Sequence, residues 1–388
     1  MTGLRKGKKP FCFLLCFTML LFGLLFPTFA EEVSEFGDEL PEEYVDFLES
    51  IPEEILELLP EGLFSTDSST VGDAVSEMSS FTYLLQTLLT LIGLRIGECV
   101  GILASVCGLL ILSAVFRTLR TSFGNESVAR AFSFCSTLVI TLALIGQSYR
   151  CLDGVTQYFS TLNSITSASV PLMGALYAMG GNITAAVASS GGLSVFMTVL
   201  EQIVSKSIVP FCGICMALAL VGALDSSVRL GTLLSTLKKN YTTVLSFLMM
   251  LLLAMLGAQT TLAAHGDTLA MRSVKFAAGN MIPVVGGSVS DLLRTVSASV
   301  GYLRGTVGIC GILLLVLCLL PTLVELLLLR LTWQLCASVA DILGCDGEKK
   351  LLDEFASILG FLIAAVSICS SVLLLSMTLL AHCASALG

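Results

Sequence analysis

Charged residues are scarce in this chain of 388 residues, because Asp, Glu, Lys and Arg together make up only 13% of it. A soluble globular domain carries about 25% of such residues, so the composition excludes a water-soluble protein. Only two histidines occur, His265 and His382, which argues against a histidine-based metal site. The sequence has no P-loop, no HExxH and no Gly-x-Ser-x-Gly motif, and so offers no catalytic residue and no cofactor site. These absences predict a membrane protein that is not an enzyme.

Hydrophobic residues, by contrast, make up 55% of the chain, and the mean hydropathy is +0.93. The formal net charge of −9 comes from 29 acidic and 20 basic residues, which argues against nucleic acid as a partner. The charges are unevenly distributed, since 16 of the acidic residues lie between Glu31 and Glu77, where no Lys or Arg occurs. The acidity therefore belongs to one segment of the chain.

The first thirty residues, 1–30, have the three parts of a secretory signal peptide. A start with four basic residues precedes an apolar run over 11–26, and Thr28 and Ala30 then supply the small side chains of a cleavage site. Cleavage after Ala30 places the mature N-terminus outside the cytoplasm. Because the apolar run is long for a signal peptide, an uncleaved membrane anchor stays open as the alternative.

Residues 31–80 form the acidic segment, which the leader places on the extracytoplasmic side. Pro41 and Pro52 each precede two Glu residues, as at a helix start, because proline fits the first turn and Glu favours its positive end. We expect two short amphipathic helices, the second led by Ile55, whose apolar faces pack on this chain or on a partner. The alternative is a solvated tether, and in both cases the Ser- and Thr-rich stretch 65–80 is expected to be a linker.

Long apolar runs dominate the rest of the chain. A helix needs about 20 mostly apolar residues to cross a bilayer core about 30 Å thick. Two weak runs, 162–179 and 183–204, are rich in Ser, Gly, Ala and Thr and either span the membrane or re-enter it. The expected fold is all-α, a polytopic membrane helical bundle of six to eight spans, with a first bundle over 81–263 and C-terminal spans over 306–388. The six clear runs are 99–116, 131–149, 208–224, 241–263, 306–329 and 355–382.

Either number of spans leaves the mature N-terminus and the C-terminus outside and places the loops 225–240 and 330–354 in the cytoplasm. Nine Lys and Arg residues then lie on the cytoplasmic side of the membrane and seven on the outer side, which agrees weakly with the positive-inside rule. Segments 225–240 and 288–305 have apolar residues at helical spacing beside charged ones. They are expected to be amphipathic helices that do not span, the first at the inner membrane surface.

Two carboxylates in or beside the apolar runs are candidate intramembrane polar groups, because charge inside a bilayer is costly. Glu201 precedes a break between two runs. Glu325 follows Pro321, which is expected to open the helix and free a carbonyl for a polar neighbour. Because Glu325 falls near the inner end of its run, an interfacial carboxylate is the competing interpretation. The 14 cysteines mostly occur singly and are expected to act as small apolar residues, including the pair Cys212 and Cys215.

Small residues recur at spacings that favour close helix packing in membranes. Gly97 and Gly101 lie four residues apart, and the Ser- and Ala-rich run contains Gly191 and Gly192. Such helices bury themselves in protein, whether their own chain or another. Broken helices rich in small residues also line transporter cavities, so a self-contained secondary transporter or permease that uses Glu201 and Glu325 is the alternative function.

The most distinctive stretch is 268–287, TLAMRSVKFAAGNMIPVVGG, which predicts a short basic helix stopped by a Gly-Asn pair and a proline. It contains the pattern Arg-x-x-Lys-Phe-x-x-Gly-Asn-x-x-Pro-Val-x-Gly. In this pattern the sequence resembles the stage III sporulation protein AE family of endospore-forming bacteria. The resemblance extends to the leader, the acidic segment and the run of spans. The residues of the pattern are Arg272, Lys275, Phe276, Gly279, Asn280, Pro283 and Gly286.

The resemblance implies a non-enzymatic subunit of the complex of stage III sporulation proteins AA to AH, in the mother-cell membrane that surrounds the forespore. Together with stage II sporulation protein Q across the intermembrane space, this complex is expected to form a channel or secretion-like conduit needed for late forespore gene activation and spore formation. These proteins and membrane lipid are the implied partners. The region 264–305 is expected to lie outside the cytoplasm or to re-enter the membrane, with its motif residues as partner contacts.

Overall fold

A computed structural model of the chain describes residues 51, 53–56, 59–64, 68–123, 126–179, 183–224, 230–281 and 286–385. Side chains are described for most of these residues outside 119–134, 173–190, 260–307 and 379–385. The predicted signal peptide and the first predicted helix of the acidic segment lie outside the described residues. Within the described ranges every element of secondary structure is helical.

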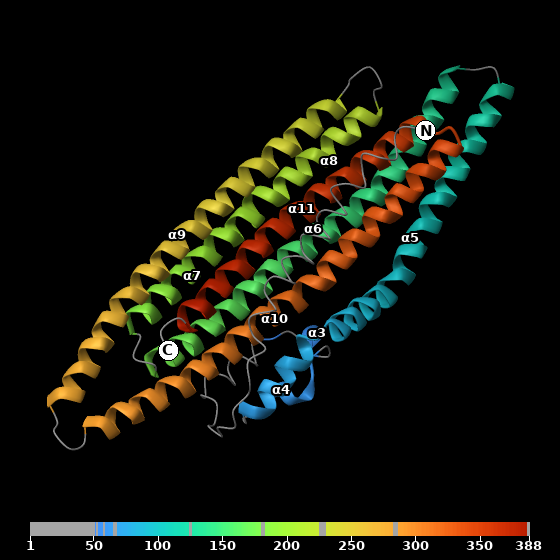
Figure 1. Ribbon diagram of the computed structural model, residues 1–388. Helices are drawn as coiled ribbons and strands as arrows, with labels where there is room; N and C mark the ends of the chain where they lie inside the picture. Colours follow the sequence, from blue (N-terminus) through green and yellow to red (C-terminus); the bar gives the residue numbers. More distant parts are fainter. Residues whose placement is uncertain are drawn as a thin grey trace.

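Six long helical rods run side by side, and short elements precede them (Figure 1). The C-terminal ends of α5, α8 and α10 gather at one end of the bundle, and those of α6 and α9 lie at the opposite end. The short elements are α3 (Glu53–Leu56), the 3-10 turn η1 (Glu61–Phe64) and α4 (Ser68–Met78). The rods are α5 (Phe81–Phe123), α6 (Glu126–Met179), α7 (Ile183–Ile203) continued by η2 (Val204–Ile208) and α8 (Val209–Leu224), α9 (Leu230–Met281), α10 (Gly286–Ile342) and α11 (Asp346–Ser385).

Each rod contains one segment that is long and apolar enough to cross a membrane, which gives six candidate spans within the described residues. This number confirms an all-α polytopic bundle and matches the six clear apolar runs of the sequence. The rods are much longer than a span, however. The 57 residues of α10 extend for about 85 Å at about 1.5 Å per residue, against a bilayer core of about 30 Å.

The two weak runs do not form separate helices. The run 162–179 continues α6 without a break, and 183–204 continues through η2 into α8. The break expected after Glu201 is a π-helical turn, η2, in which the Ser207 hydroxyl lies 2.5 Å from the Tyr241 hydroxyl of α9. A π turn widens the helix by one residue without ending it, so the rod stays continuous past this point.

Two predicted amphipathic helices are also parts of longer rods. From Leu230 the segment 225–240 belongs to α9, and 288–305 belongs to α10. The opening expected at Pro321 does not end the helix, because α10 stays helical on both sides of that proline. Proline removes one backbone hydrogen bond, and neighbouring helices in a bundle can hold such a helix together.

The turn between α10 and α11 is a helix C-cap that requires glycine. Gly344 has φ of 68°, in the left-handed region that favours glycine, and the Cys345 amide donates to the Ala340 carbonyl at 2.8 Å. Lys349 Nζ of α11 then lies 2.6 Å from Asp341 Oδ1 of α10, which fastens the two helices together. The most extensive helix–helix contact of the bundle, between α10 and α11, begins at this turn.

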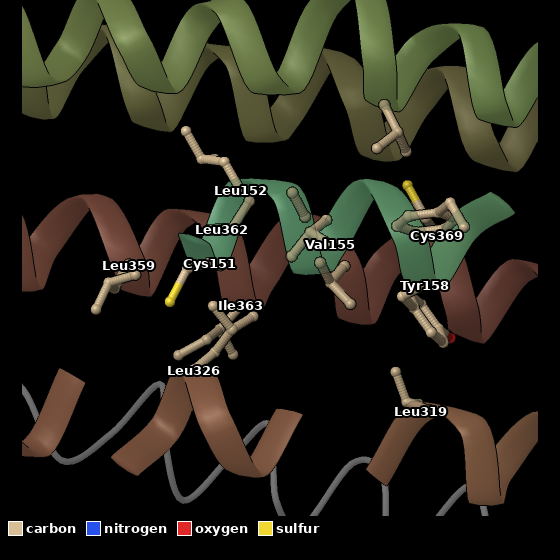
Figure 2. Close-up of a cluster of buried hydrophobic side chains, with 14 of the residues drawn as sticks. Cys151, Leu152, Val155, Tyr158, Leu319, Leu326, Leu359, Leu362, Ile363 and Cys369 are labelled. Carbon is tan, nitrogen blue, oxygen red and sulfur yellow. The ribbon is translucent and has the colours of Figure 1, made fainter. Parts of the chain in front are cut away.

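Helix α11 is the centre of the bundle, since it packs against α6, α8, α9 and α10 and touches α7. Figure 2 shows its Leu359, Ile363 and Cys369 among buried side chains of α6 and α10. Nearer its start, Phe355 makes an edge contact with Trp333 of α10, with ring centroids 5.7 Å apart. These large buried rings join α10 and α11 into one core.

The acidic segment ends in a small helical unit packed on the long helices. Leu63, Val71 and Met78 are fully buried, and α4 contacts both α10 and α5. The apolar side chain of Ile55 is also buried in the core of this chain. The linker predicted over 65–80 is therefore wrong for Ser68–Met78, where Val71, Ala74, Val75 and Met78 follow helical spacing.

Candidate functional site

Four charged side chains from three helices meet at one level of the bundle. Arg95 of α5 lies 3.7 Å from Glu325 of α10, and Arg150 of α6 lies 3.1 Å from Glu98 of α5. Arg95 also approaches Glu98, one turn away on the same helix, at 3.6 Å. Gln147 accepts a hydrogen bond from Arg150 Nε at 3.2 Å. Arg95, Glu98, Arg150 and Glu325 form what is called here the charged network.

The charged network is balanced, with two cations and two anions, and all four residues lie within candidate membrane spans. Their side chains are between 38% and 60% exposed, so in water each pair would contribute at most about 1 kcal/mol. In a less polar surrounding the same pairs interact more strongly, because charges are screened less there. The mutual pairing reduces the cost of keeping these charges in apolar helices.

The network corrects the predicted position of Glu325. The sequence predicts Glu325 near the inner end of its run, whereas Glu98 directly precedes the first clear run, 99–116. Contact with Arg95, three residues before Glu98, shows that Glu325 lies at their level. Helix α10 is simply longer than one span, so counting residues from the ends of an apolar run misplaces this carboxylate.

The outward surface of α6 changes character at the network. Before Arg150, the exposed side chains include Leu138, Val139 and Leu142. After Arg150, they are polar, beginning with Asp153 and continuing through Gln157, Ser160, Ser164 and Ser167. The rod therefore exposes an apolar surface on one side of the charged network and a polar surface on the other. The first suits lipid, and the second suits water or a polar partner.

Glu201, the other predicted intramembrane carboxylate, lies elsewhere. The Asn163 side chain of α6 donates to Glu201 Oε2 of α7 at 2.9 Å, in a partly buried contact. Glu325 is instead paired with α5, so the two carboxylates have different partners on different helices. The structure gives each a neighbour but does not join them in one polar cluster.

The family-like motif lies where α9 ends and α10 begins, at the far end of the bundle from the α10–α11 turn (Figure 1). Arg272, Lys275, Phe276, Gly279 and Asn280 fall in the last turns of α9, and Gly286 is the first residue of α10. Helix α9 ends at Met281, next to the predicted stop at Gly279 and Asn280, but it is a long helix and not the short one expected from the sequence. Pro283 and all the motif side chains lie outside the described residues.

Sequence reasoning missed a buried cation between α9 and α11. Lys238 is 7% exposed, and its Nζ lies 2.7 Å from Ser357 Oγ and 3.3 Å from Glu354 Oε2. The sequence instead predicts Lys238 at the cytoplasmic surface, within the amphipathic segment 225–240. The signal was present in the sequence, because Lys238 shares the helical spacing of Leu234, Tyr241 and Leu245, which face the bundle.

Among the side chains that the structure describes, no group of three His, Cys, Asp or Glu residues could hold a metal ion. The eleven described cysteines are free thiols, and Cys212 and Cys215 are both buried between helices. They pack as small apolar residues on α8.

Comparison with known proteins decides between the many families of polytopic membrane proteins. A family profile described as Stage III sporulation protein AE matches residues 69–384, which is most of the chain. The chain belongs to this sporulation family. It is 24% identical over 352 residues to Stage III sporulation protein AE of Bacillus subtilis (strain 168), covering 90% of this chain and 84% of the relative. No solved structure matches the chain. A role in sporulation and a multi-pass membrane location follow from the family and the six candidate spans.

Proposed function

We propose that the protein is a non-enzymatic, multi-pass subunit of a channel or secretion-like complex that links mother cell and forespore. Its partners in this proposal are the other stage III sporulation proteins of the AA to AH set and, across the intermembrane space, stage II sporulation protein Q. It resides in the mother-cell membrane around the forespore, with its mature N-terminus extracytoplasmic. In this setting it supports late forespore gene activation.

The observation that carries the proposal is the two-part surface of α6. On one side of the charged network α6 exposes apolar side chains, and on the other it exposes only polar ones before Pro171. Helices this long extend well beyond a bilayer core, which leaves a substantial part of the bundle free to meet protein partners.

The half of the bundle in which α6 exposes polar side chains also carries the two segments that the proposal assigns to partner contact. Helix α4, at the end of the acidic segment, packs on α10 and α5 in this half, and the α9–α10 hairpin with its motif lies at its tip (Figure 1). Helix α4 contains Asp73 and Glu77, and the motif contains Arg272 and Lys275, so the two segments carry opposite charge. Complementary charge favours a specific orientation during association.

The transporter alternative has less support. It needs Glu201 and Glu325 at a substrate or ion site, yet each carboxylate already has a neighbour in this chain, Asn163 and Arg95 respectively. A carboxylate that binds an ion needs free oxygens, which these contacts partly occupy. A transporter of this kind would work alone in liposomes, whereas a subunit of a conduit needs its neighbours.

The motif provides the test of the proposed function. We expect simultaneous replacement of Arg272, Lys275, Asn280 and Pro283 by Ala to block sporulation while the protein accumulates normally. Loss of an interface hot spot costs about 2 kcal/mol or more, so co-purification of the other sporulation proteins should fall at least about ten-fold. The measurements are heat-resistant spore counts, the protein level in membranes and the amount of each partner recovered.

A matched control replaces Ser235, Thr236, Lys239 and Asn240, which are exposed near the start of α9, at the opposite end of that helix from the motif, by Ala. These four changes should leave both spore counts and co-purification unchanged. Normal sporulation of the motif variant at a normal protein level would show that the motif is not a partner contact.

A further inference from the structure

Arg330 is a cation without an anion in the middle of the α10–α11 interface. It lies within the candidate span Gly308–Ile342, and its Nε is buried with no hydrogen-bond partner among the described residues. By contrast Arg95, Arg150, Lys238 and Lys349 each have a described carboxylate oxygen at 2.6 to 3.7 Å. No such pair involves Arg330 in the described part of the chain.

Gly360 of α11 makes room for this guanidinium. A Cβ atom placed on Gly360 would lie 2.9 Å from Arg330 Cζ and about as close to both terminal nitrogens, at 3.0 and 3.1 Å. The whole guanidinium plane therefore rests against the α11 backbone. Because glycine has no side chain, the Arg330 guanidinium can lie against α11 here, where a Cβ atom would displace it. The sequence thus makes room for the arginine but, within the described part of the chain, places no anion beside it.

A second cation lies one helical turn away. Lys238 of α9 donates to Ser357 Oγ, and Ser357 precedes Gly360 by three residues on α11, which makes the two positions neighbours on the helix surface. Lys238 is largely neutralised by Glu354 at 3.3 Å, whereas Arg330 is not. The turn of α11 from Ser357 to Gly360 is thus flanked by two cations and one anion, which leaves one positive charge in excess.

An unpaired cation among apolar helices is costly, and such residues mark binding sites or ion pathways. Arginine presents several N–H donors in a planar fork that matches the oxygens of a phosphate. Basic pockets between membrane helices are typical binding sites for the headgroups of anionic lipids. Leu331 and Leu335, both exposed on α10 next to Arg330, offer an apolar surface to acyl chains.

From these observations we infer that Arg330, with Gly360 as its cradle and Lys238 and Ser357 beside it, binds the phosphate of an anionic phospholipid. The lipid is favoured over free phosphate because the site lies within an apolar span and borders exposed leucines. The bound phosphodiester accepts hydrogen bonds from the guanidinium and neutralises the excess charge. The inference does not depend on the proposed conduit, since it concerns only this chain and lipid.

The experiment uses the purified full chain in a non-ionic detergent and follows its thermal unfolding. Phosphatidylglycerol is added in one arm, phosphatidylcholine in a second and inorganic phosphate in a third. We expect phosphatidylglycerol to raise Tm on the order of 5 °C at saturation, since a ligand that binds only the folded state stabilises it. Phosphatidylcholine and inorganic phosphate should change Tm by less than about one fifth of that.

Arg330→Gln should abolish the response to phosphatidylglycerol, whereas Lys349→Gln, which removes a cation near the start of α11, should keep it. In lipid-free detergent Arg330→Gln should be at least as stable as the parent chain, because it removes an unpaired charge. If Arg330 had only a structural role, Arg330→Gln would be less stable than the parent chain in lipid-free detergent. The inference is overturned if Arg330→Gln keeps the lipid response, or if inorganic phosphate alone reproduces it.

Gly360→Ala provides the test if Arg330→Gln does not fold. The added methyl group displaces the guanidinium and should weaken the binding of phosphatidylglycerol about ten-fold, which is the effect of losing one well-placed charged hydrogen bond. Gly311→Ala on α10 is the matched control, because a Cβ there meets nothing within 4 Å. Equal lipid responses of the two alanine variants would contradict the site.

Discussion

Helices α11 and α5 are both apolar enough to span a membrane, yet they occupy opposite surroundings. In α11, 67% of the most apolar 18-residue stretch is buried inside the protein, whereas in α5 the share is 17%. The first is enclosed by other helices, and the second exposes Leu94, Val100 and Ile111 along its length. Apolar sequence therefore indicates that a helix avoids water, but it does not indicate whether protein or lipid surrounds it.

The glycines of α5 and α7 also differ in their surroundings. On α5, an added Cβ at Gly97 or Gly101 meets nothing within 4 Å, so no close packing uses this spacing in the part of the chain that the structure describes. On α7, a Cβ at Gly192 would lie 2.8 Å from Leu256 Cδ1 of α9. Here the small side chain does allow two helices to approach closely. The open glycines of α5 remain available to another helix.

The largest expected effect comes from the aromatic contact at the centre of the bundle. Trp333→Ala should lower the free energy of unfolding by about 3–5 kcal/mol, because it removes a fully buried ring that packs on Phe355. Leu94→Ala on the exposed side of α5 should change it by about 0.5 kcal/mol or less. Unfolding in detergent, followed by circular dichroism, measures both. Similar losses for the two variants would mean that α5 is enclosed as α11 is.

An intermediate effect, opposite in sign at the two positions, is expected for the glycines. Gly192→Ala should lower the free energy of unfolding by about 1–3 kcal/mol, because Leu256 has to move. Gly97→Ala should raise it by up to about 1 kcal/mol, since alanine favours helix and has free space there. If the purified Gly97→Ala protein is more stable but spore counts fall, another subunit packs on α5. Unchanged spore counts would favour lipid at that face.

The smallest effect is expected in the charged network, which joins α5 to the interior. A double-mutant cycle with Arg95→Gln and Glu325→Gln should give a coupling energy of about 0.5–1 kcal/mol, because the pair is partly exposed and 3.7 Å apart. The same cycle with Arg95→Gln and Glu201→Gln should give no coupling, since Glu201 pairs with Asn163 instead. A coupling in the second cycle would show that Arg95 also interacts with Glu201.

The apolar runs of the sequence were sufficient to predict the fold class and the six candidate spans. They were not sufficient to predict helix length. Ser- and Gly-rich stretches such as 162–179 and 183–204 lack the composition of a lipid-exposed span, and so they suggested separate elements. In the bundle 162–179 continues α6, and 183–204 forms α7 and continues through η2 into α8. A helix that packs against other helices needs only small residues and a narrow apolar stripe, as at Val155, Phe159 and Leu162 of α6.

The sequence was also not sufficient to predict the neighbours of the polar groups. Sequence alone identified Glu201 and Glu325 as unusual, but their neighbours Asn163 and Arg95 lie far away in the chain, and no local pattern connects them. Arg330 was assigned to a cytoplasmic loop because it follows an apolar run. Its burial depends on α10 extending to Ile342 and on Gly360 of a different helix, and neither can be inferred from the spacing around Arg330.

The central position of α11 has a consequence for synthesis. A ribosome releases the chain from its N-terminus, so α5 to α10 enter the membrane before the helix that they surround exists. Until Asp346–Ser385 arrives, the buried side chains of α6, α8 and α10 have no partner at the middle of the bundle. A nascent chain halted before Asp346 therefore lacks the helix on which α6, α8, α9 and α10 pack.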